Sequence, residues 1–122
     1  EADIRAMHDP TEGGLATGLL ELTIASNTGV IVYEDKIHCL EETSILCSEY
    51  KIDPLGVIAS GALLIVVDPD DRDTVLSKLV QNDIACSVIG KLTDKEDGLK
   101  IIADGEEREL PFFVVDEITR VL

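Results

Sequence analysis

The segment Met7–Leu15 marks the end of a strand and the start of a helix, and it constrains the fold more than any other stretch of the chain. Asp9 suits an N-cap, because its carboxylate can accept hydrogen bonds from backbone N–H groups one turn ahead. Pro10 suits the first helical position, where no N–H is needed, and Glu12 has the spacing of a capping box. Leucines then recur at helical spacing. The segment therefore predicts a helix that starts here and runs to about Ser26.

Two consecutive glycines, Gly13 and Gly14, fall in the first turn of this predicted helix. Each costs roughly 1 kcal/mol relative to alanine in a helix interior. The segment Asp68–Asp71 has a similar capping pattern ahead of another predicted helix, whose first turns contain no glycine. The glycines are explained if another group approaches the backbone closely, or if the turn is not a regular helix. Exposed N–H groups at such a helix start favour anions, so a packing role and a binding role both stay open.

The order of predicted elements along the chain indicates an α+β fold. Strands are expected at Ile4–Met7, Val30–Tyr33, Ala62–Val67, Cys86–Gly90, Leu99–Ala103 and Glu107–Leu110, and further helices at Glu41–Tyr50 and Pro69–Asn82. Asp104–Gly105 is a strong hairpin signal. The uninterrupted apolar run Ala62–Val67 predicts a strand buried on both faces, and hence a central one. In the helix at 41–50, Ile45, Leu46 and Tyr50 are expected to face inward. Together these elements predict a mixed sheet packed by about three helices, partly in ferredoxin-like order.

Charge and composition exclude several classes of function. The net charge of −15 argues against binding to nucleic acids or to anionic membranes, because both require positive surfaces. No apolar run is long enough to span a membrane. The three cysteines, Cys39, Cys47 and Cys86, match no zinc or redox spacing, and we expect reduced thiols in a cytoplasmic protein. The chain begins with Glu1, so residues 1–122 are expected to be one domain of a longer polypeptide.

Other candidate chemistry is sparse. Gly56 and Gly61 have part of the spacing of a phosphate-binding loop, but the residues that follow are not Lys-Ser or Lys-Thr, so a P-loop is rejected. Ser60 and Gly61 fit either a tight entry into the next strand or a substrate contact. His8 could act as a general base or hydrogen-bond near the helix start. No second histidine lies at a metal-ligand spacing, so no metal site formed by this chain alone is predicted.

The string Ala6–Ala16 resembles the start of the C-terminal domain of the AIR synthase-related superfamily. That superfamily includes aminoimidazole ribonucleotide synthase (PurM), the hydrogenase maturation factor HypE, selenophosphate synthetase and thiamine-monophosphate kinase. The Asp-Pro-Thr-x-Gly-Gly-Leu-Ala pattern is most similar to that of HypE-like proteins. Two later segments, Asp53–Gly56 and Ala59–Leu64, also resemble the family pattern. The resemblance extends over nearly the whole chain and implies a fold like that of the PurM C-terminal domain.

The resemblance implies a two-domain, ATP-dependent enzyme that dimerises through its N-terminal domain and activates an acceptor by phosphoryl transfer. It further implies that the N-terminal domain holds most of the ligands for ATP and Mg²⁺, while the present domain closes the cleft. A maturation protein is a further partner that it suggests. On this basis the candidate site residues are Asp9 and His8 as catalytic groups, and Thr11, Glu12, Gly13, Gly14, Ser60 and Gly61 as nucleotide or substrate contacts.

Two departures from the HypE pattern keep three hypotheses open. HypE proteins end in a cysteine that accepts a carbamoyl group, whereas this sequence ends at Leu122. Glu12 stands where HypE sequences often carry arginine, which removes a positive charge. The leading hypothesis is a HypE-like enzyme with an unknown acceptor, whose C-terminal domain alone does not turn over ATP. The alternatives are a non-catalytic ligand-binding or assembly paralogue, and a HypE whose cysteine tail is cut from this sequence.

Overall fold

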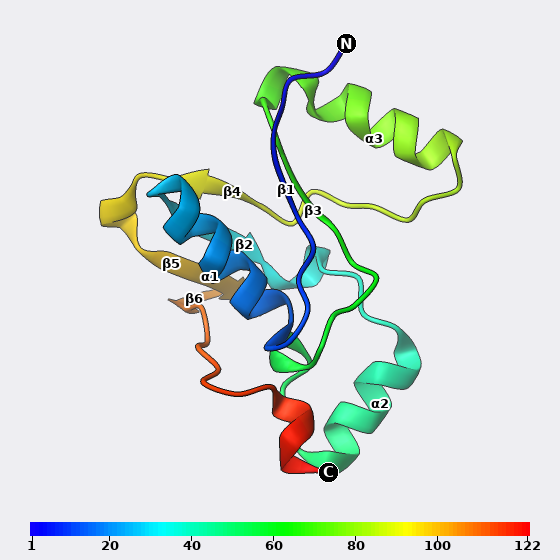
Figure 1. Cartoon of the computed structure of the whole chain (residues 1–122), viewed down its shortest axis with the longest axis vertical. Coiled ribbons are helices and arrows are strands. Elements are labelled where there is room, and N and C mark those ends of the chain that lie inside the picture. Colours follow the sequence, from blue (N-terminus) through cyan, green and yellow to red (C-terminus); the bar gives the residue numbers. More distant parts are fainter.

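The computed structural model describes all residues, 1–122, as three α-helices and six β-strands in two sheets (Figure 1). The helices are α1 (Gly14–Ser26), α2 (Glu41–Tyr50) and α3 (Arg72–Gln81). One sheet is an antiparallel pair of β1 (Ile4–His8) and β3 (Leu64–Val67). The other is a mixed sheet with the strand order β4-β2-β5-β6. The predicted mixed α/β class with three helices is therefore confirmed.

The four-stranded sheet is built around β2 (Gly29–Tyr33). This strand lies antiparallel to β4 (Gly90–Thr93) and parallel to β5 (Leu99–Ala103). From β5 the chain turns through Asp104–Gly105 into the antiparallel β6 (Glu106–Glu109), so the hairpin prediction is confirmed. At the sheet edge, all four residues of β6 are charged and exposed.

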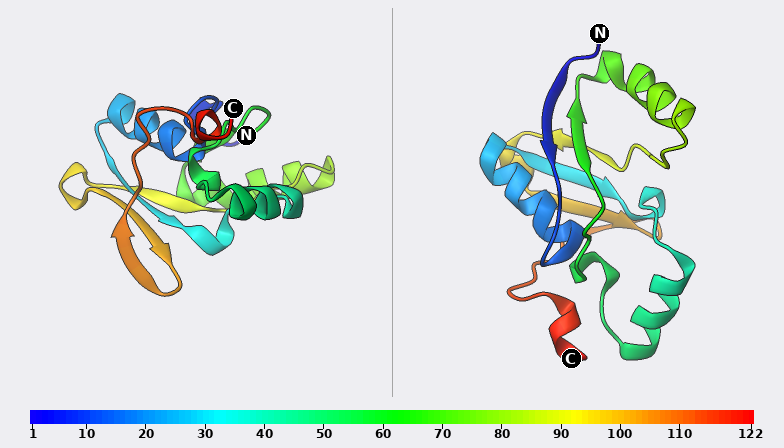
Figure 2. Two further views of the ribbon diagram at one scale, coloured as in Figure 1. Left: turned by 90° about the horizontal axis from the view of Figure 1, so that it is seen from below. Right: turned by 45° about the vertical axis from the view of Figure 1, so that its right-hand side comes forward.

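The core lies between α1 and the four-stranded sheet (Figure 2). Its six buried members are all aliphatic: Ala16, Leu19, Val30, Val32, Leu55 and Ile101. Burial of one larger aliphatic side chain stabilises a fold by about 1.5–3 kcal/mol. Only 17 of the 122 residues are buried, so most of the apolar packing is concentrated in this cluster.

The apolar run Ala62–Val67 does not form a central strand, and that prediction is wrong. Only its last four residues form β3, which pairs with β1 alone and is half-buried throughout. A continuous apolar strand is buried on both faces when layers cover both sides of its sheet. Here the two-stranded ribbon runs across α1, where Leu64 lies near Gly18, and Leu63, just before the strand, is 54% exposed. The central position belongs to β2 instead.

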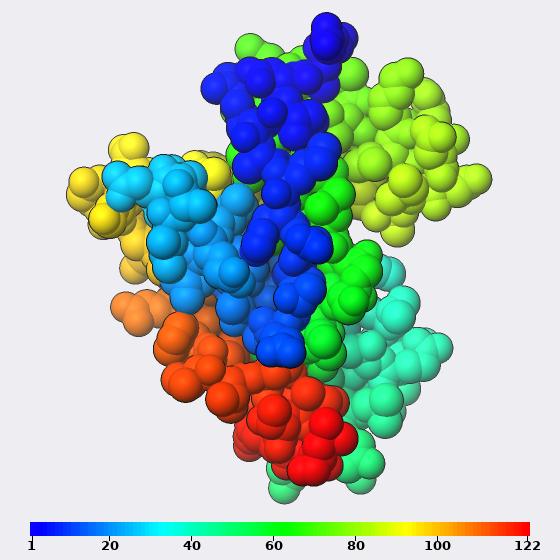
Figure 3. Space-filling model, viewed as in Figure 1, coloured from blue at the N-terminus to red at the C-terminus, as the bar shows by residue number.

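Two further expectations are also wrong. Residues 86–89 form no strand, since β4 starts only at Gly90. In α2, Ile45, Leu46 and Tyr50 are exposed, and Cys47 is the only buried residue. The helices α2 and α3 extend away from the core (Figures 1 and 3), so most of the apolar surface of α2 stays exposed. None of the helices has the length and hydropathy needed to cross a membrane.

Candidate functional site

The turn between β1 and α1 differs from the capped helix start expected from the sequence. The helix begins at Gly14, and its N-cap is Gly13, which has a left-handed backbone with φ of 79°. No side chain caps the helix, so the prediction that Asp9 is the N-cap is wrong. Gly14 also has a positive φ of 68°. These two residues turn the chain at the start of the helix, which places Asp9 outside the first helical turn.

Both glycines have a structural reason in this turn. A Cβ at Gly14 would overlap the carbonyl oxygen of Leu55 and lie 2.7 Å from that of Val57. A Cβ at Gly13 would overlap the side chain of Thr17. The backbone of this turn therefore packs directly on the backbone of the loop that follows α2. Close packing accounts for the glycines, and a bound ligand is not needed to explain them.

One backbone carbonyl oxygen both closes this turn and joins it to the loop ahead of β3. The carbonyl oxygen of Thr11 accepts from the N–H of Gly14 at 3.1 Å and from the N–H of Ala59 at 3.2 Å. The second bond brings Ser60 and Gly61 beside the turn, although the two segments are far apart in the sequence. Both residues are exposed, and Gly61 has a φ of +98° with open space around it.

The C-terminal segment supplies a contact that sequence reasoning missed. One carboxylate oxygen of Asp116 accepts from the N–H of Gly13 at 2.7 Å, and the other accepts from the N–H of Ile118 at 2.9 Å. Asp116 is 9% exposed. Its sequence context indicates only the cap of a short final turn, the 3₁₀ helix Glu117–Arg120. No local signal points to a partner 103 residues away.

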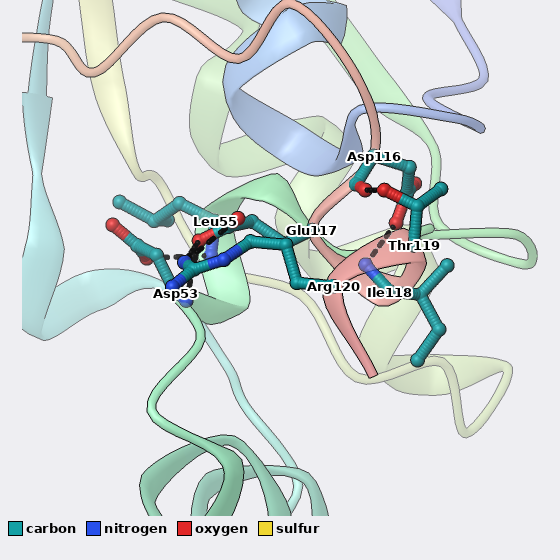
Figure 4. Close-up of polar contacts among 7 residues, drawn as sticks. All are labelled: Asp53, Leu55, Asp116, Glu117, Ile118, Thr119 and Arg120. Carbon is teal, nitrogen blue, oxygen red and sulfur yellow. Dashed lines mark hydrogen bonds and ion pairs between the residues drawn. The ribbon is translucent and has the colours of Figure 1, made fainter. Parts of the chain in front are cut away.

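Glu117 forms a partly buried contact with the loop after α2 (Figure 4). Its carboxylate accepts from the N–H of Asp53 at 3.1 Å and pairs with the Arg120 guanidinium at 3.0 and 3.1 Å. The hydrogen bond from the Asp53 backbone, followed by the pairing with Arg120, lowers the pKa of Glu117 although burial acts in the opposite direction. Glu117 is therefore held as a carboxylate.

A cleft of about 480 Å³ lies between the glycine turn and the C-terminal segment. Its lining residues are Glu12, Gly13, Thr17, Ile58, Phe113, Val114, Val115, Asp116, Ile118 and Thr119. The wall is mostly apolar, and its charged groups are the carboxylates of Glu12 and Asp116. No lysine, arginine or histidine lines it. The space-filling view places the red C-terminal segment directly against the blue start of α1 (Figure 3).

The predicted site residues occupy different places around this cleft. Glu12 and Gly13 line it, whereas Asp9 and Thr11 lie on the exposed part of the same turn. His8 is not among the lining residues. Its Nε2 is buried without a hydrogen bond and lies 3.8 Å from a carboxylate oxygen of Glu21 on α1. No group of three or more histidine, cysteine, aspartate or glutamate side chains could hold a metal ion.

Known proteins resemble the chain in both sequence and structure. A protein of Methanocaldococcus jannaschii assigned to hydrogenase expression or formation is 32% identical over 120 residues, which cover 97% of this chain and 36% of that protein. Carbamoyl dehydratase HypE of Rhizobium leguminosarum is 38% identical over 78 residues, or 64% of this chain and 22% of the relative. The chain therefore spans about a third or less of the length of these relatives.

Solved structures agree with the sequence relatives. Hydrogenase maturation protein HypE in complex with ATP matches 98% of this chain with a TM-score of 0.83 at 27% identity, over 38% of its own length. HypE in a HypE–HypF complex matches 88% of this chain with a TM-score of 0.80 at 28% identity, and the match covers 36% of that HypE chain. Residues 1–102 match the family described as AIR synthase related protein, C-terminal domain. The chain thus belongs to the AIR synthase-related family, as its C-terminal domain.

Proposed function

We propose that residues 1–122 are the C-terminal domain of a two-domain, ATP-dependent enzyme related to HypE, and that they close a nucleotide site formed mainly by an N-terminal domain. The reaction class is transfer of the γ-phosphoryl group of ATP to an acceptor, with ADP as the leaving group. The observation that carries the proposal is the joining of the two family-like segments, through Thr11, beside one cleft. The likeness to an ATP-bound HypE supports it.

The residues of this chain do not by themselves fit a triphosphate. The cleft presents two carboxylates and no cationic side chain, and the N–H of Gly13 already donates to Asp116. Cations for the phosphates, Mg²⁺ included, must therefore come from outside this domain. In the proposal, Asp9, Thr11 and Glu12 face the nucleotide from the exposed side of the turn, with Ser60 and Gly61 beside them. His8 is a weaker candidate because it lies against α1.

A non-catalytic binding or assembly domain is the second candidate function. The observation that favours it is the same lack of positive charge around the cleft. A HypE crystallised with HypF shows that a relative assembles with another maturation protein. In this second proposal the domain contributes a surface for such a partner, or for dimerisation of the full-length protein, and carries out no phosphoryl transfer.

Phosphate release from Mg-ATP by the full-length gene product, with residues 1–122 as the control, tests the first proposal. Turnover by the whole protein and none by the domain alone is the expected result. The Asp9→Asn variant of the full-length protein is expected to lose at least tenfold in turnover, because Asp9 would contact the nucleotide. The matched control is Asp104→Asn, at the exposed tip of the β5–β6 hairpin.

Two results would count against this proposal. Lack of both turnover and nucleotide binding in the full-length protein would favour the binding or assembly domain. Full turnover in a folded Asp9→Asn protein would remove Asp9 from the site and leave the turn with a packing role only.

A further inference from the structure

We propose that the uncovered face of the four-stranded sheet is an interface between two copies of this protein, related by a twofold axis that runs along the strands. In this arrangement β4 of one copy lies over β6 of the other. The inference concerns assembly of the protein, and it depends neither on ATP turnover nor on a ligand in the cleft.

The register of the strands defines which residues share this face. Residues opposite each other on paired strands point to the same side of a sheet. One row begins with Lys91 on β4, followed by its partner Ile31 on β2 and by Lys100 on β5. The row ends with Glu109 on β6, the partner of Lys100. We call this row and the next one the open face, and the next row consists of Tyr33, Ile102 and Glu107.

No α-helix of this chain covers the open face. Val30, Val32 and Ile101 point to the opposite side, pack with α1 and are 3%, 0% and 0% exposed. Ile31 and Ile102 are only half-buried, and the left view of Figure 2 shows α1 on one side of the sheet and no helix on the other. Because β2 and β5 are parallel, and parallel strands occur mainly in sheets covered on both faces, the sheet lacks a covering layer here.

The open face lies on the side of the sheet away from the candidate site. The glycine turn starts α1, and α1 covers the other face. A domain that docks at the cleft therefore leaves the open face uncovered. A nucleic acid does not fit either, because the net charge of the chain is −15. The charges on the face itself indicate which protein surface complements it.

These charges are separated by sign across the sheet. Lys91 lies on the edge strand β4 and Lys100 on β5, whereas Glu107 and Glu109 lie on the opposite edge strand, β6. None of the four forms an ion pair within the chain. All four charges can therefore pair with another molecule without breaking an internal contact.

A twofold axis along the strands makes this pattern complementary to itself. It places β4 over β6 of the other copy and β2 over β5, so Lys91 of each copy faces Glu109 of the other. Ile31 then meets the aliphatic stem of Lys100. An axis across the strands would instead place β4 over β4 and β6 over β6, with like charges opposed. The charges thus favour one orientation of the second copy over the other.

The open face is small, which fixes how the association should be measured. Four strands about 4.8 Å apart, with about 3.3 Å per residue along each strand, give a flat area of about 300 Å². Each partner of a stable complex typically buries about 800 Å². We therefore expect weak association through this face, which requires a concentration series.

Carbodiimide cross-linking of the full-length protein tests the arrangement directly, because this reagent joins lysines to carboxylates that contact them. Isotope-labelled and unlabelled copies are mixed, so mass spectrometry separates links between copies from links within one. We expect a link from Lys91 of one copy to Glu109 of the other. Lys95, which is exposed in the turn after β4 and lies outside the open face, should give none. Absence of the Lys91 link between copies would overturn the proposal.

Charge reversal in the full-length protein tests the pairing independently. Lys91→Glu and Glu109→Lys each oppose like charges at both contacts, so each should raise the dissociation constant from sedimentation velocity by about tenfold or more. A mixture of the two variants restores opposite charges and should associate as the wild type does. Lys95→Glu is the control, because it changes the net charge as Lys91→Glu does. A mixture that stays dissociated, or a control as weak as Lys91→Glu, would refute the twofold interface.

Discussion

Substitution of Gly14 by alanine gives the sharpest test of the turn geometry. In an ordinary helix interior this change stabilises a protein by roughly 1 kcal/mol. Here the backbone is left-handed, with φ of 68°, which costs an alanine about 1–2 kcal/mol. The new Cβ would also overlap the carbonyl oxygen of Leu55 and lie 2.7 Å from that of Val57. Overpacking of this kind typically costs about 1–3 kcal/mol. The expected loss is therefore about 2–5 kcal/mol, opposite in sign to the usual effect.

Urea denaturation of the wild type and the Gly14→Ala variant measures this free-energy difference. The matched control is Gly105→Ala, because Gly105 has a similar φ of 76° but open space around its Cβ position. In the control variant only the left-handed backbone conformation is strained, so its free energy of unfolding should fall by only about 1–2 kcal/mol. A Gly14→Ala protein as stable as the wild type would refute the left-handed turn. A loss equal to that of Gly105→Ala would refute the close contact with the loop.

Two further predictions concern titration and reactivity. The folded-state pKa of Glu117 is lowered, so its contribution to stability is present above the pKa of the unfolded state and is lost as pH falls through the folded-state pKa. Stability measured from pH 5 to pH 2.5 should therefore fall more steeply in the wild type than in Glu117→Gln, and parallel curves would contradict this. Burial is the main cause that raises the pKa of the Cys47 thiol. Iodoacetamide at pH 8 should modify the two exposed cysteines well before Cys47, as judged by mass spectrometry, and early labelling of Cys47 would contradict its burial.

Elements specified by adjacent residues were predictable from the sequence. The hairpin at Asp104–Gly105 depends on two residues that adopt positive φ readily, and the structure has both in that conformation. The bounds of α2 also agree with the prediction of Glu41–Tyr50. Burial was less predictable, because it depends on which surface each element meets. The helical pattern of α2 was correct, yet Ile45, Leu46 and Tyr50, which were expected to face inward, are exposed.

In the candidate site too, the features set by adjacent residues were predictable and those set by distant contacts were not. The sequence drew attention to the turn at Asp9–Gly14, but it favoured a capped helix because the spacing of polar residues suited one. The actual turn depends on the approach of Leu55 and on the carboxylate of Asp116, both distant in sequence. Contacts between segments so far apart leave no periodic signal in a single sequence. Only the three-dimensional path of the chain brings them together.

The charged edge strand β6 has a consequence for the behaviour of the protein at high concentration. An edge strand offers unpaired N–H and C=O groups that can recruit the same edge of another molecule into a continuous sheet. Along Glu106–Glu109 the side chains are three glutamates and one arginine, all exposed. Two such edges at neutral pH repel each other before their backbones can pair. The charged side chains of this strand thus disfavour pairing between molecules at the β6 edge of the sheet.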